Sequence, residues 1–382
     1  MNTLRWIKES FRSCNPNKAI ARQAIRHLKK IEKKQLFSDD ISTMRAAEGR
    51  WYESLMYEML LEFSHSSGNI QHIVRKGADA PFPSIPTRFG QNGLYFSNRG
   101  DINIRGNGQD IAEVDMLFVG GDGKIGFAEV VTSGTELKEL REEVHYKKKL
   151  LGYLYGQITV PFVLFSSVDI SRSSVVKRLM RETESVLIVT KSCETLKHLL
   201  SSSSTRGIPR KPLKHAKLID VKDLQPRRPF DYKQIHDYRR DRILSEITTG
   251  RQKKEEFHEK DELPPLAKKL LLGAIHEPGS QELWKGKTLV IKGTQYDQEK
   301  ISKEFSKIII ALDIPEFEPV IYLRSRNKKE YLKVVVRKSG GFRVESKRTP
   351  QMTGFFLWLE SLKPTLGGKV CRKYADLFLT RA

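Results

Sequence analysis

The chain has 382 residues, more than one ordinary hydrophobic core holds, so two domains are expected. Its 68 lysines and arginines exceed its 46 aspartates and glutamates, which gives a formal net charge of +22, and 38% of its residues are hydrophobic. That hydrophobic content suffices for packed cores and excludes a wholly disordered basic protein. No apolar run approaches the roughly 18–20 residues that a membrane span needs.

The three cysteines, Cys14, Cys193 and Cys371, lie far apart in the sequence. They predict neither a disulfide framework nor a CxxC zinc site, so a reducing compartment fits best. The first residues lack the apolar segment of a secretory signal. We therefore expect a protein that is not secreted and that resides in the cytoplasm, the nucleoid or the nucleus.

The positive charge is distributed unevenly along the chain. Residues 1–40 carry 10 basic and 4 acidic side chains, residues 41–200 carry 19 and 19, and residues 201–382 carry 39 and 23. This partition predicts a neutral, carboxylate-bearing segment between basic segments that attract a polyanion. The densest basic run, 206–240, is interleaved with aromatic residues, which is typical of a nucleic-acid surface and equally of a solvated linker.

The first half of the chain alternates between helical and strand patterns. A basic amphipathic helix is expected over residues 17–36, within a helical N-terminal segment that spans 1–40. The expected elements of residues 41–200 are a helix at 43–63, strands at 111–119 and 124–131 joined by a glycine-rich turn, a helix at 136–157, a strand at 160–166, a helix at 171–184, a strand at 186–189 and a short helix at 194–200. This order predicts a domain of the α/β class with a mixed sheet flanked by helices.

A run of serines at 201–204 is expected to end that domain. Residues 201–285 are predicted to form a basic linker with helices, including one at 263–275. Residues 286–382 are predicted to form a basic α+β domain with a strand at 287–293, a helix at 298–312, strands near 317–324, 330–337 and 341–346, and a helix at 352–362. The candidate nucleic-acid-binding residues are Arg227, Arg228, Arg239, Arg240, Arg324 and Arg326. A structural or partner-binding role of the last domain is the alternative.

Two acidic residues interrupt the apolar strands of the expected hairpin. Its pairing places Asp115 opposite residue 128 or 129, so the carboxylates of Asp115 and Glu129 become cross-strand neighbours. Two such carboxylates repel each other unless one is protonated or a cation lies between them. Mg²⁺ or Mn²⁺, held by carboxylates and a substrate phosphate, would satisfy them. The alternative is an ordinary sheet face with alternating acidic residues.

Residues 43–190 resemble the PD-(D/E)xK, or restriction-endonuclease-like, nuclease superfamily. The similarity lies in the helical motif Gly49-Arg50-Trp51-Tyr52-Glu53, in Asp115 on the first strand and in Glu129 within FAEVV on the second. The resemblance implies a restriction-endonuclease-like mixed sheet and metal-dependent cleavage of phosphodiester bonds. It also implies that Asp115 and Glu129 hold the metal and that Glu53 joins them directly or through water, with Glu48 as a weaker substitute for Glu53.

The sequence departs from the family at the lysine. The family's lysine falls at Val131, and a valine cannot offset charge at the reacting phosphate. Some family members supply the lysine from the following helix, and Lys147 lies on the apolar stripe of the 136–157 helix, where it would need a partner. The alternative is that Lys147 extends to solvent.

The sequence therefore predicts a Mg²⁺- or Mn²⁺-dependent endonuclease with Glu53, Asp115, Glu129 and Lys147 as its catalytic set. DNA is favoured over RNA as the substrate, and basic flanking regions would bind the nucleic-acid backbone. The oligomeric state is open, a homodimer being one alternative. The other hypothesis is an inactive, nuclease-derived nucleic-acid-binding or structural protein.

Overall fold

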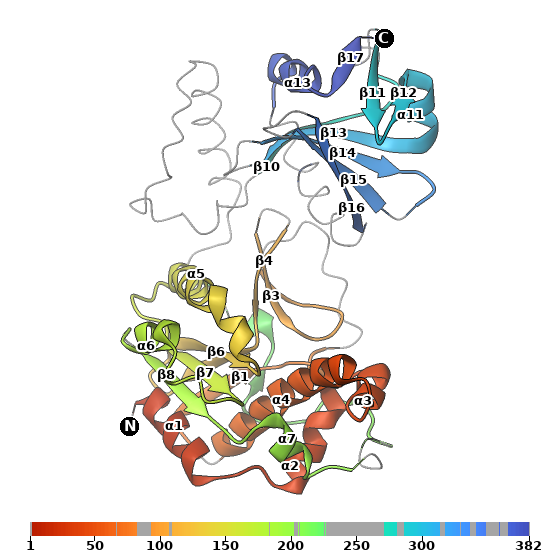
Figure 1. Cartoon of the computed structure of the whole chain (residues 1–382). Helices are drawn as coiled ribbons and strands as arrows, with labels where there is room; N and C mark the ends of the chain where they lie inside the picture. Colours follow the sequence, from red (N-terminus) through yellow and green to blue (C-terminus); the bar gives the residue numbers. More distant parts are fainter. Residues whose placement is uncertain are drawn as a thin grey trace. The chain divides into compact units, whose positions relative to one another are not determined.

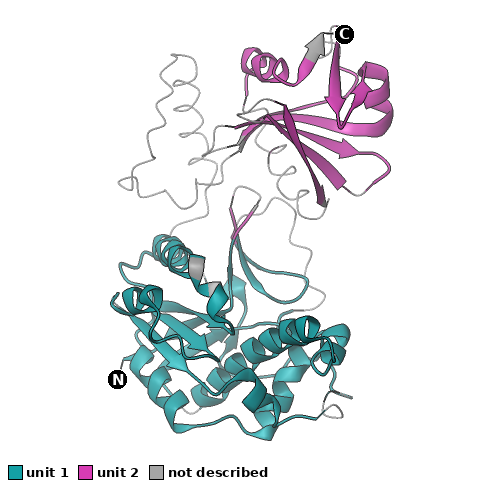
Figure 2. Cartoon of the chain, viewed as in Figure 1, with its two compact units in different colours: residues 1–87, 94–104, 112–229 teal, residues 88–93, 105–111, 230–382 magenta. Residues whose placement is uncertain are grey.

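A computed structural model describes most of the chain. The described residues are 2–65, 67–81, 93–106, 109–182, 184–201, 205, 207–224, 226, 271–280, 286–313, 318–328, 330–336, 341–348, 359 and 366–381. They fall into two compact units (Figures 1 and 2). Unit 1 comprises Met1–Thr87, Leu94–Ile104 and Ala112–Pro229, and unit 2 comprises Arg88–Gly93, Arg105–Ile111 and Phe230–Ala382. Among the described residues, no helix is long and apolar enough to cross a bilayer.

Unit 1 is built on a six-stranded sheet of order β8-β7-β6-β5-β1-β9. Its strands are β1 (Ile70–Val74), β5 (Met116–Gly120), β6 (Ile125–Val131), β7 (Phe162–Ser166), β8 (Ser185–Val189) and β9 (Leu218–Ile219). Strands β6, β7 and β8 run parallel, whereas β1, β5 and β6 pair antiparallel. The prediction of a mixed α/β sheet is confirmed.

Helices cover both faces of this sheet (Figure 1). They are α1 (Thr3–Ser13), α2 (Lys18–Ala24), η1 (Ile25–His27), α3 (Lys30–Gln35), α4 (Ile41–Ser64), η2 (Gly134–Glu136), α5 (Leu137–Tyr155), α6 (Ser174–Met180), α7 (Cys193–Lys197) and η4 (Val221–Asp223). Trp51 and Leu55 of α4 pack in one core with Ala128 of β6. Because side chains alternate along a strand, Glu129 points to the opposite face, which α5 covers.

The expected helix at 17–36 is wrong as a single element. Leu28 has an extended backbone, with φ −71° and ψ 144°, and separates η1 from α3. The break turns Arg26 and His27 into the interior, where both find hydrogen-bonding partners on α4. Helical periodicity alone could not reveal this break, because the favourable contacts are made with a distant part of the chain.

The expected strand at 111–119 is divided at Asp115. Residues before it form β4 (Gln109–Val114), which belongs to a three-stranded sheet with β2 (Gly93–Phe96) and β3 (Ile102–Gly106), and residues after it form β5. Met116 pairs with Ala128, so continuing the β5–β6 register by one residue brings Asp115 opposite Glu129. The tight turn between β5 and β6 depends on Gly123, whose φ of 75° favours glycine.

Unit 1 extends beyond the serine run at 201–204 that was expected to end it. Strand β9 pairs in parallel with β1, with Leu218 opposite Ile73, and therefore belongs to the central sheet. The unit ends at Pro229. A two-residue strand has too little pattern to be predicted from sequence.

Unit 2 contains a five-stranded antiparallel sheet of order β10-β13-β14-β15-β16 and a three-stranded sheet of order β12-β11-β17. The first consists of β10 (Leu271–His276), β13 (Phe305–Asp313), β14 (Glu318–Ser325), β15 (Glu330–Val336) and β16 (Phe342–Arg348). The second consists of β11 (Lys287–Ile291), β12 (Thr294–Tyr296) and β17 (Leu379–Arg381). Its described helices are α11 (Gln298–Glu304) and α13 (Gly368–Ala375), and α13 was not predicted.

Two helix predictions in unit 2 are wrong. The expected helix at 298–312 ends at Glu304, and the following residues form β13, which pairs with β10 on one side and β14 on the other. The run Ile308–Ile310 suits a buried strand, because β-branched side chains pack well in a sheet. Within the expected helix at 263–275, the described residues 271–275 belong to strand β10. The expected helix at 352–362 lies outside the described residues, apart from Leu359.

Candidate active site

Asp115 and Glu129 lie beside each other at one end of the β5–β6 pair. Oδ2 of Asp115 accepts a hydrogen bond of 2.8 Å from the backbone N–H of Val130, the residue after Glu129. Glu129 is buried, and only 11% of its side chain is exposed. The bend at Asp115 thus directs this carboxylate toward β6, in the neighbourhood that the hairpin register predicts.

Lys147 reaches Glu129 from helix α5. Its Nζ atom lies 2.8 Å from Oε2 of Glu129 and 2.8 Å from Oε1 of Glu143, one helical turn earlier. Only 3% of the Lys147 side chain is exposed, so it does not extend to solvent. Val131, where the resemblance would place a lysine, is buried and apolar. The structure therefore brings a lysine amine to Glu129 from the helix, as the stripe suggested.

Glu53 is linked to Asp115 through a lysine that the sequence analysis missed. Lys76, two residues after β1, forms an ion pair with Oε1 of Glu53, and its Nζ donates a 2.6 Å hydrogen bond to the backbone carbonyl of Asp115. Only 7% of the Lys76 side chain is exposed. Residue 76 follows a strand that shows no clear periodicity and precedes a loop-rich stretch, so its sequence context carried no signal.

Burial and neighbouring charges perturb the titration of these groups. Burial raises the pKa of Glu129 to about 8, with a further increase from Asp115 and an opposing decrease from Lys147. Burial lowers the pKa of Lys147, but the carboxylates of Glu129 and Glu143 outweigh it, so the net shift is upward. Glu113 also has a raised pKa, first through burial and then through Asp101 and Asp115. The site therefore crowds carboxylates in a poorly solvated space, as functional sites often do.

Glu129 offers a ligand atom that suits a divalent cation. Its Oε1 atom is buried and has no hydrogen-bonding partner among the described residues, whereas Oε2 is held by Lys147. Carboxylate oxygens are the ligands that Mg²⁺ prefers. Asp115 and Glu129 thus fit the ion that the resemblance implies.

The carboxylates of Glu53, Asp115 and Glu129 are not all close enough together to ligate one metal ion. Potential metal ligands are the side chains of His, Cys, Asp and Glu. Within the described part of the chain, one group of three such side chains has its ligand atoms within 4.8 Å of one another, and it consists of His27, Glu58 and Asp79. Glu53, in contrast, is paired with Lys76. A cation shared by all three predicted ligands would have to approach a Glu53 carboxylate that already carries the positive charge of this lysine.

The group of His27, Glu58 and Asp79 is explained by an arginine. Arg26, with 5% of its side chain exposed, donates to Glu58 at 2.7 and 3.0 Å and to Asp79 at 2.5 and 2.7 Å. Nδ1 of His27 accepts from the N–H of Ala78 at 3.0 Å, so Nε2 is left to donate to Glu58 at 2.7 Å. The guanidinium already pairs with both carboxylates, and the group is best described as a buried ion-pair network.

A cavity of about 1260 Å³ opens at Glu53 and Asp115. Residues 132–135, which follow β6, line it together with the cationic side chains Arg45, Arg50 and Lys197. Glu48 lines it as well but forms an ion pair with Lys197, which makes it a poorer ligand candidate than Glu53. The cavity combines carboxylates with basic groups, as a site for a phosphodiester requires.

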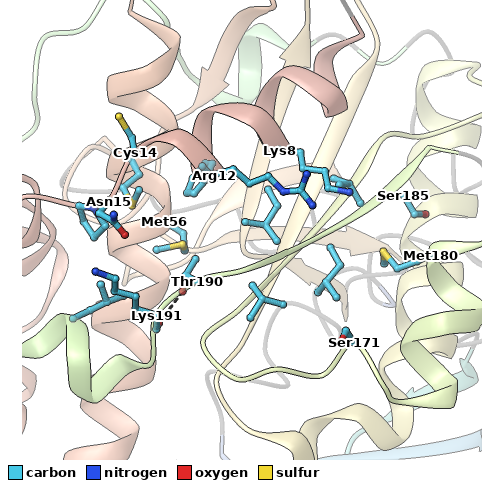
Figure 3. Close-up of a pocket in the computed structure, with 18 residues that line it drawn as sticks. Lys8, Arg12, Cys14, Asn15, Met56, Ser171, Met180, Ser185, Thr190 and Lys191 are labelled. Atoms are coloured by element: carbon cyan, nitrogen blue, oxygen red, sulfur yellow. Dashed lines mark hydrogen bonds between the residues drawn. The ribbon is translucent and has the colours of Figure 1, made fainter.

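A second hollow in unit 1 has a different character. It has a volume of about 690 Å³ and lies between α1 and β8, where Lys8, Arg12 and Lys191 surround it (Figure 3). Hydroxyl groups of Ser171 and Thr190 also line it, and no acidic residue does so among the described ones. Its cationic lining favours an anion over a metal cation.

The predicted nucleic-acid-binding arginines are only partly described. Arg324 lies on β14, and the Nε atom of Arg326 donates a 2.9 Å hydrogen bond to the carbonyl of Ser302. The other four, Arg227, Arg228, Arg239 and Arg240, lie outside the described residues.

No family model, curated protein or solved structure matches the chain. The structure itself shows a mixed α/β fold, and the finer expectation of a restriction-endonuclease-like fold stays a proposal.

Proposed function

We propose that unit 1 is a divalent-metal-dependent endonuclease that hydrolyses phosphodiester bonds, with DNA as its preferred substrate. The observation that carries this proposal is the 2.8 Å contact between Lys147 Nζ and Glu129 Oε2, next to the carboxylate of Asp115. Asp115 lines the open cavity together with Glu53, and it lies next to Glu129 and the buried Lys147, so the carboxylates and the cation that such a hydrolysis needs occur together. The net charge of +22 supports a polyanionic substrate.

Each residue has a role in this proposal. Asp115 and Glu129 hold Mg²⁺ or Mn²⁺, and Glu53 joins them. The bound metal supplies Lewis-acid stabilisation of the reacting phosphate. Lys147 holds Glu129 in place and offsets negative charge that develops on the phosphate oxygens. Basic residues of the flanking regions, including Arg324 and Arg326, bind the nucleic-acid backbone.

The alternative, an inactive nuclease-derived protein, rests on the valine at position 131. It would be favoured if no lysine amine reached the two carboxylates. Lys147 contacts Glu129 and Lys76 contacts the main chain of Asp115, so the cation that the valine lacks is available from elsewhere. Hydrolysis is therefore the function that the geometry supports best.

The proposal is tested by incubating the full-length protein with supercoiled plasmid, linear duplex DNA, single-stranded DNA and RNA, each with Mg²⁺, Mn²⁺ or EDTA. We expect cleavage of DNA that requires the metal and is abolished in Glu129→Ala. Glu139→Ala removes an exposed glutamate on α5 and serves as the matched control, which should cleave like the wild type. Equal activity of Glu129→Ala and the wild type would end the proposal.

A further inference from the structure

Lys76 bridges two of the proposed ligands from a position that none of the expected motifs contains. Its ammonium group pairs with the Glu53 side chain and also donates to the Asp115 carbonyl at 2.6 Å. The first partner comes from α4 and the second from the bend between β4 and β5. One buried side chain thus connects two elements that the proposed metal site must bring together.

The charges around Lys76 are those that would otherwise attract a metal ion. Besides Glu53, its electrostatic neighbours are Asp115, Asp101, Glu113 and Glu129. A buried ammonium group with so many acidic neighbours is their counter-ion. It therefore performs in the metal-free protein the charge neutralisation that a divalent cation would perform in the loaded protein.

Geometry makes the two cations competitors. With the Lys76 ammonium paired to Glu53, the Glu53, Asp115 and Glu129 ligand atoms are not all within 4.8 Å of one another. A metal ion drawn to Glu53 meets a carboxylate whose Oε1 atom is already paired with the Lys76 ammonium, and the two positive charges repel each other. The hydrogen bond to the Asp115 carbonyl can persist during this exchange, because that carbonyl oxygen belongs to the main chain.

We propose that Lys76 is a positioning residue that acts as a built-in competitor for the metal, holding Glu53 near Asp115 in the metal-free protein and giving up Glu53 when a divalent cation binds. This inference rests on the proposed metal site. It assigns to the protein a metal affinity that is weakened by its own lysine. The gain is that the acidic cluster stays neutralised and ordered before the metal arrives.

The test is the affinity of the full-length, metal-free protein for Mn²⁺ and Mg²⁺, measured by isothermal titration calorimetry. Lys76→Met removes the competing charge, and we expect it to bind Mn²⁺ about tenfold more tightly than the wild type, because the carboxylates lose their internal counter-ion. Lys76→Arg keeps the charge and should restore weak binding. Lys124→Met loses the same charge at the opposite end of the β5–β6 hairpin, where Lys124 pairs with Glu184, and should bind like the wild type.

Lys76→Gln protects the test against a folding defect, since its amide can still donate to the Asp115 carbonyl while it lacks the positive charge. It should also bind Mn²⁺ more tightly than the wild type, with an unchanged circular dichroism spectrum. Equal or weaker binding by folded Lys76→Gln and Lys76→Met would overturn the role of Lys76 and leave the metal site standing. Absence of Mn²⁺ binding in every variant, the wild type included, would overturn both proposals.

Discussion

The Nζ atom of Lys147 and the Oε2 atom of Glu129 lie 2.8 Å apart, although they come from a helix and a strand and are separated by 18 positions in the sequence. The strand position that would supply this cation in the family that the segment resembles is the buried Val131. Helix α5 therefore supplies, through Lys147, the positive charge that strand β6 lacks at Val131. This role of Lys147 can be tested directly.

Replacement of Lys147 by Met should slow DNA cleavage by about 100- to 1000-fold, because the cation beside the reacting phosphate is lost. Initial rates at saturating Mn²⁺ measure the effect. Lys148→Met is the matched control, because Lys148 contacts Ser185 and Glu182 rather than the carboxylates of the site. Similar losses in both variants would contradict a specific role of Lys147.

The double variant Val131→Lys, Lys147→Met should recover part of the lost activity. Glu129 and Val131 lie on the same face of β6, because they are two residues apart, so the new amine can approach the proposed metal site from the strand. The rate is compared with that of Lys147→Met alone, after circular dichroism has established that both proteins fold. No recovery in a folded double variant would show that the amine must come from the helix.

The carboxylate pair could be predicted from sequence because it depends on local structure. The turn at 120–123 fixes the hairpin register, and the register brings Asp115 to Glu129. Lys147 could be predicted because a lysine on a buried helical stripe needs a partner. These inferences required only neighbouring segments and the periodicities of strand and helix.

Lys76 and β13 could not be predicted, because their environments are made by distant parts of the chain. Lys76 meets Glu53 and Asp115, which lie 23 positions before it and 39 positions after it. Residues 305–313 have an apolar pattern compatible with either helix or strand, and the pairing with both β10 and β14 decides in favour of the strand. Tertiary contacts outweigh local preference in such segments.

The substitution Arg26→Met should lower the free energy of unfolding by about 3–5 kcal/mol, because it leaves the buried carboxylates of Glu58 and Asp79 without their counter-ion. Urea unfolding at neutral pH, followed by tryptophan fluorescence, measures the loss. Arg5→Met breaks the exposed pair with Glu9 and should leave stability unchanged within error. A small effect of Arg26→Met would argue against the network as a stabilising element.

As the pH is lowered from 7.5 to 5.5, His27 should make the folded state less stable, opposite in sign to Glu129, whose raised pKa makes the folded state take up a proton. Burial and the positive charge of Arg26 lower the pKa of His27 from its ordinary 6.5, against the opposing influence of Glu58, so the folded state keeps this histidine neutral. Below pH 6.5 the unfolded chain binds the proton that the folded protein excludes, which favours unfolding.

The His27 contribution is the difference between the pH dependences of the wild type and His27→Gln, both measured by urea unfolding. The glutamine cannot take up the proton, so the stability of the wild type relative to His27→Gln should decrease as the pH is lowered over this range. Parallel curves would show that His27 titrates equally in the folded and unfolded states.

Replacing Arg324 and Arg326 together by Ala should weaken DNA binding to a similar degree for unrelated sequences. If each arginine contacts one phosphate, the slope of log K against log salt concentration should become shallower by about 2. Fluorescence anisotropy between 50 and 200 mM NaCl measures it. Lys303→Ala, which breaks an exposed pair with Glu299, provides the comparison, and an unchanged slope in the double variant would remove these two arginines from the interface.

The ion-pair network around Arg26 also positions the backbone of Lys76. Asp79 is clamped by Arg26, and its backbone N–H bonds to the carbonyl of Lys76 at 2.9 Å. Between them, Gly77 packs so closely on His27 that a Cβ atom there would lie 2.5 Å from Nδ1. Glu58, the other acid of the network, stands on the same helix as Glu53. The network therefore fixes the distance between Lys76 and Glu53. Substitutions at Arg26, Gly77 or Asp79 should lower activity as active-site substitutions do, although none of these residues touches the proposed substrate.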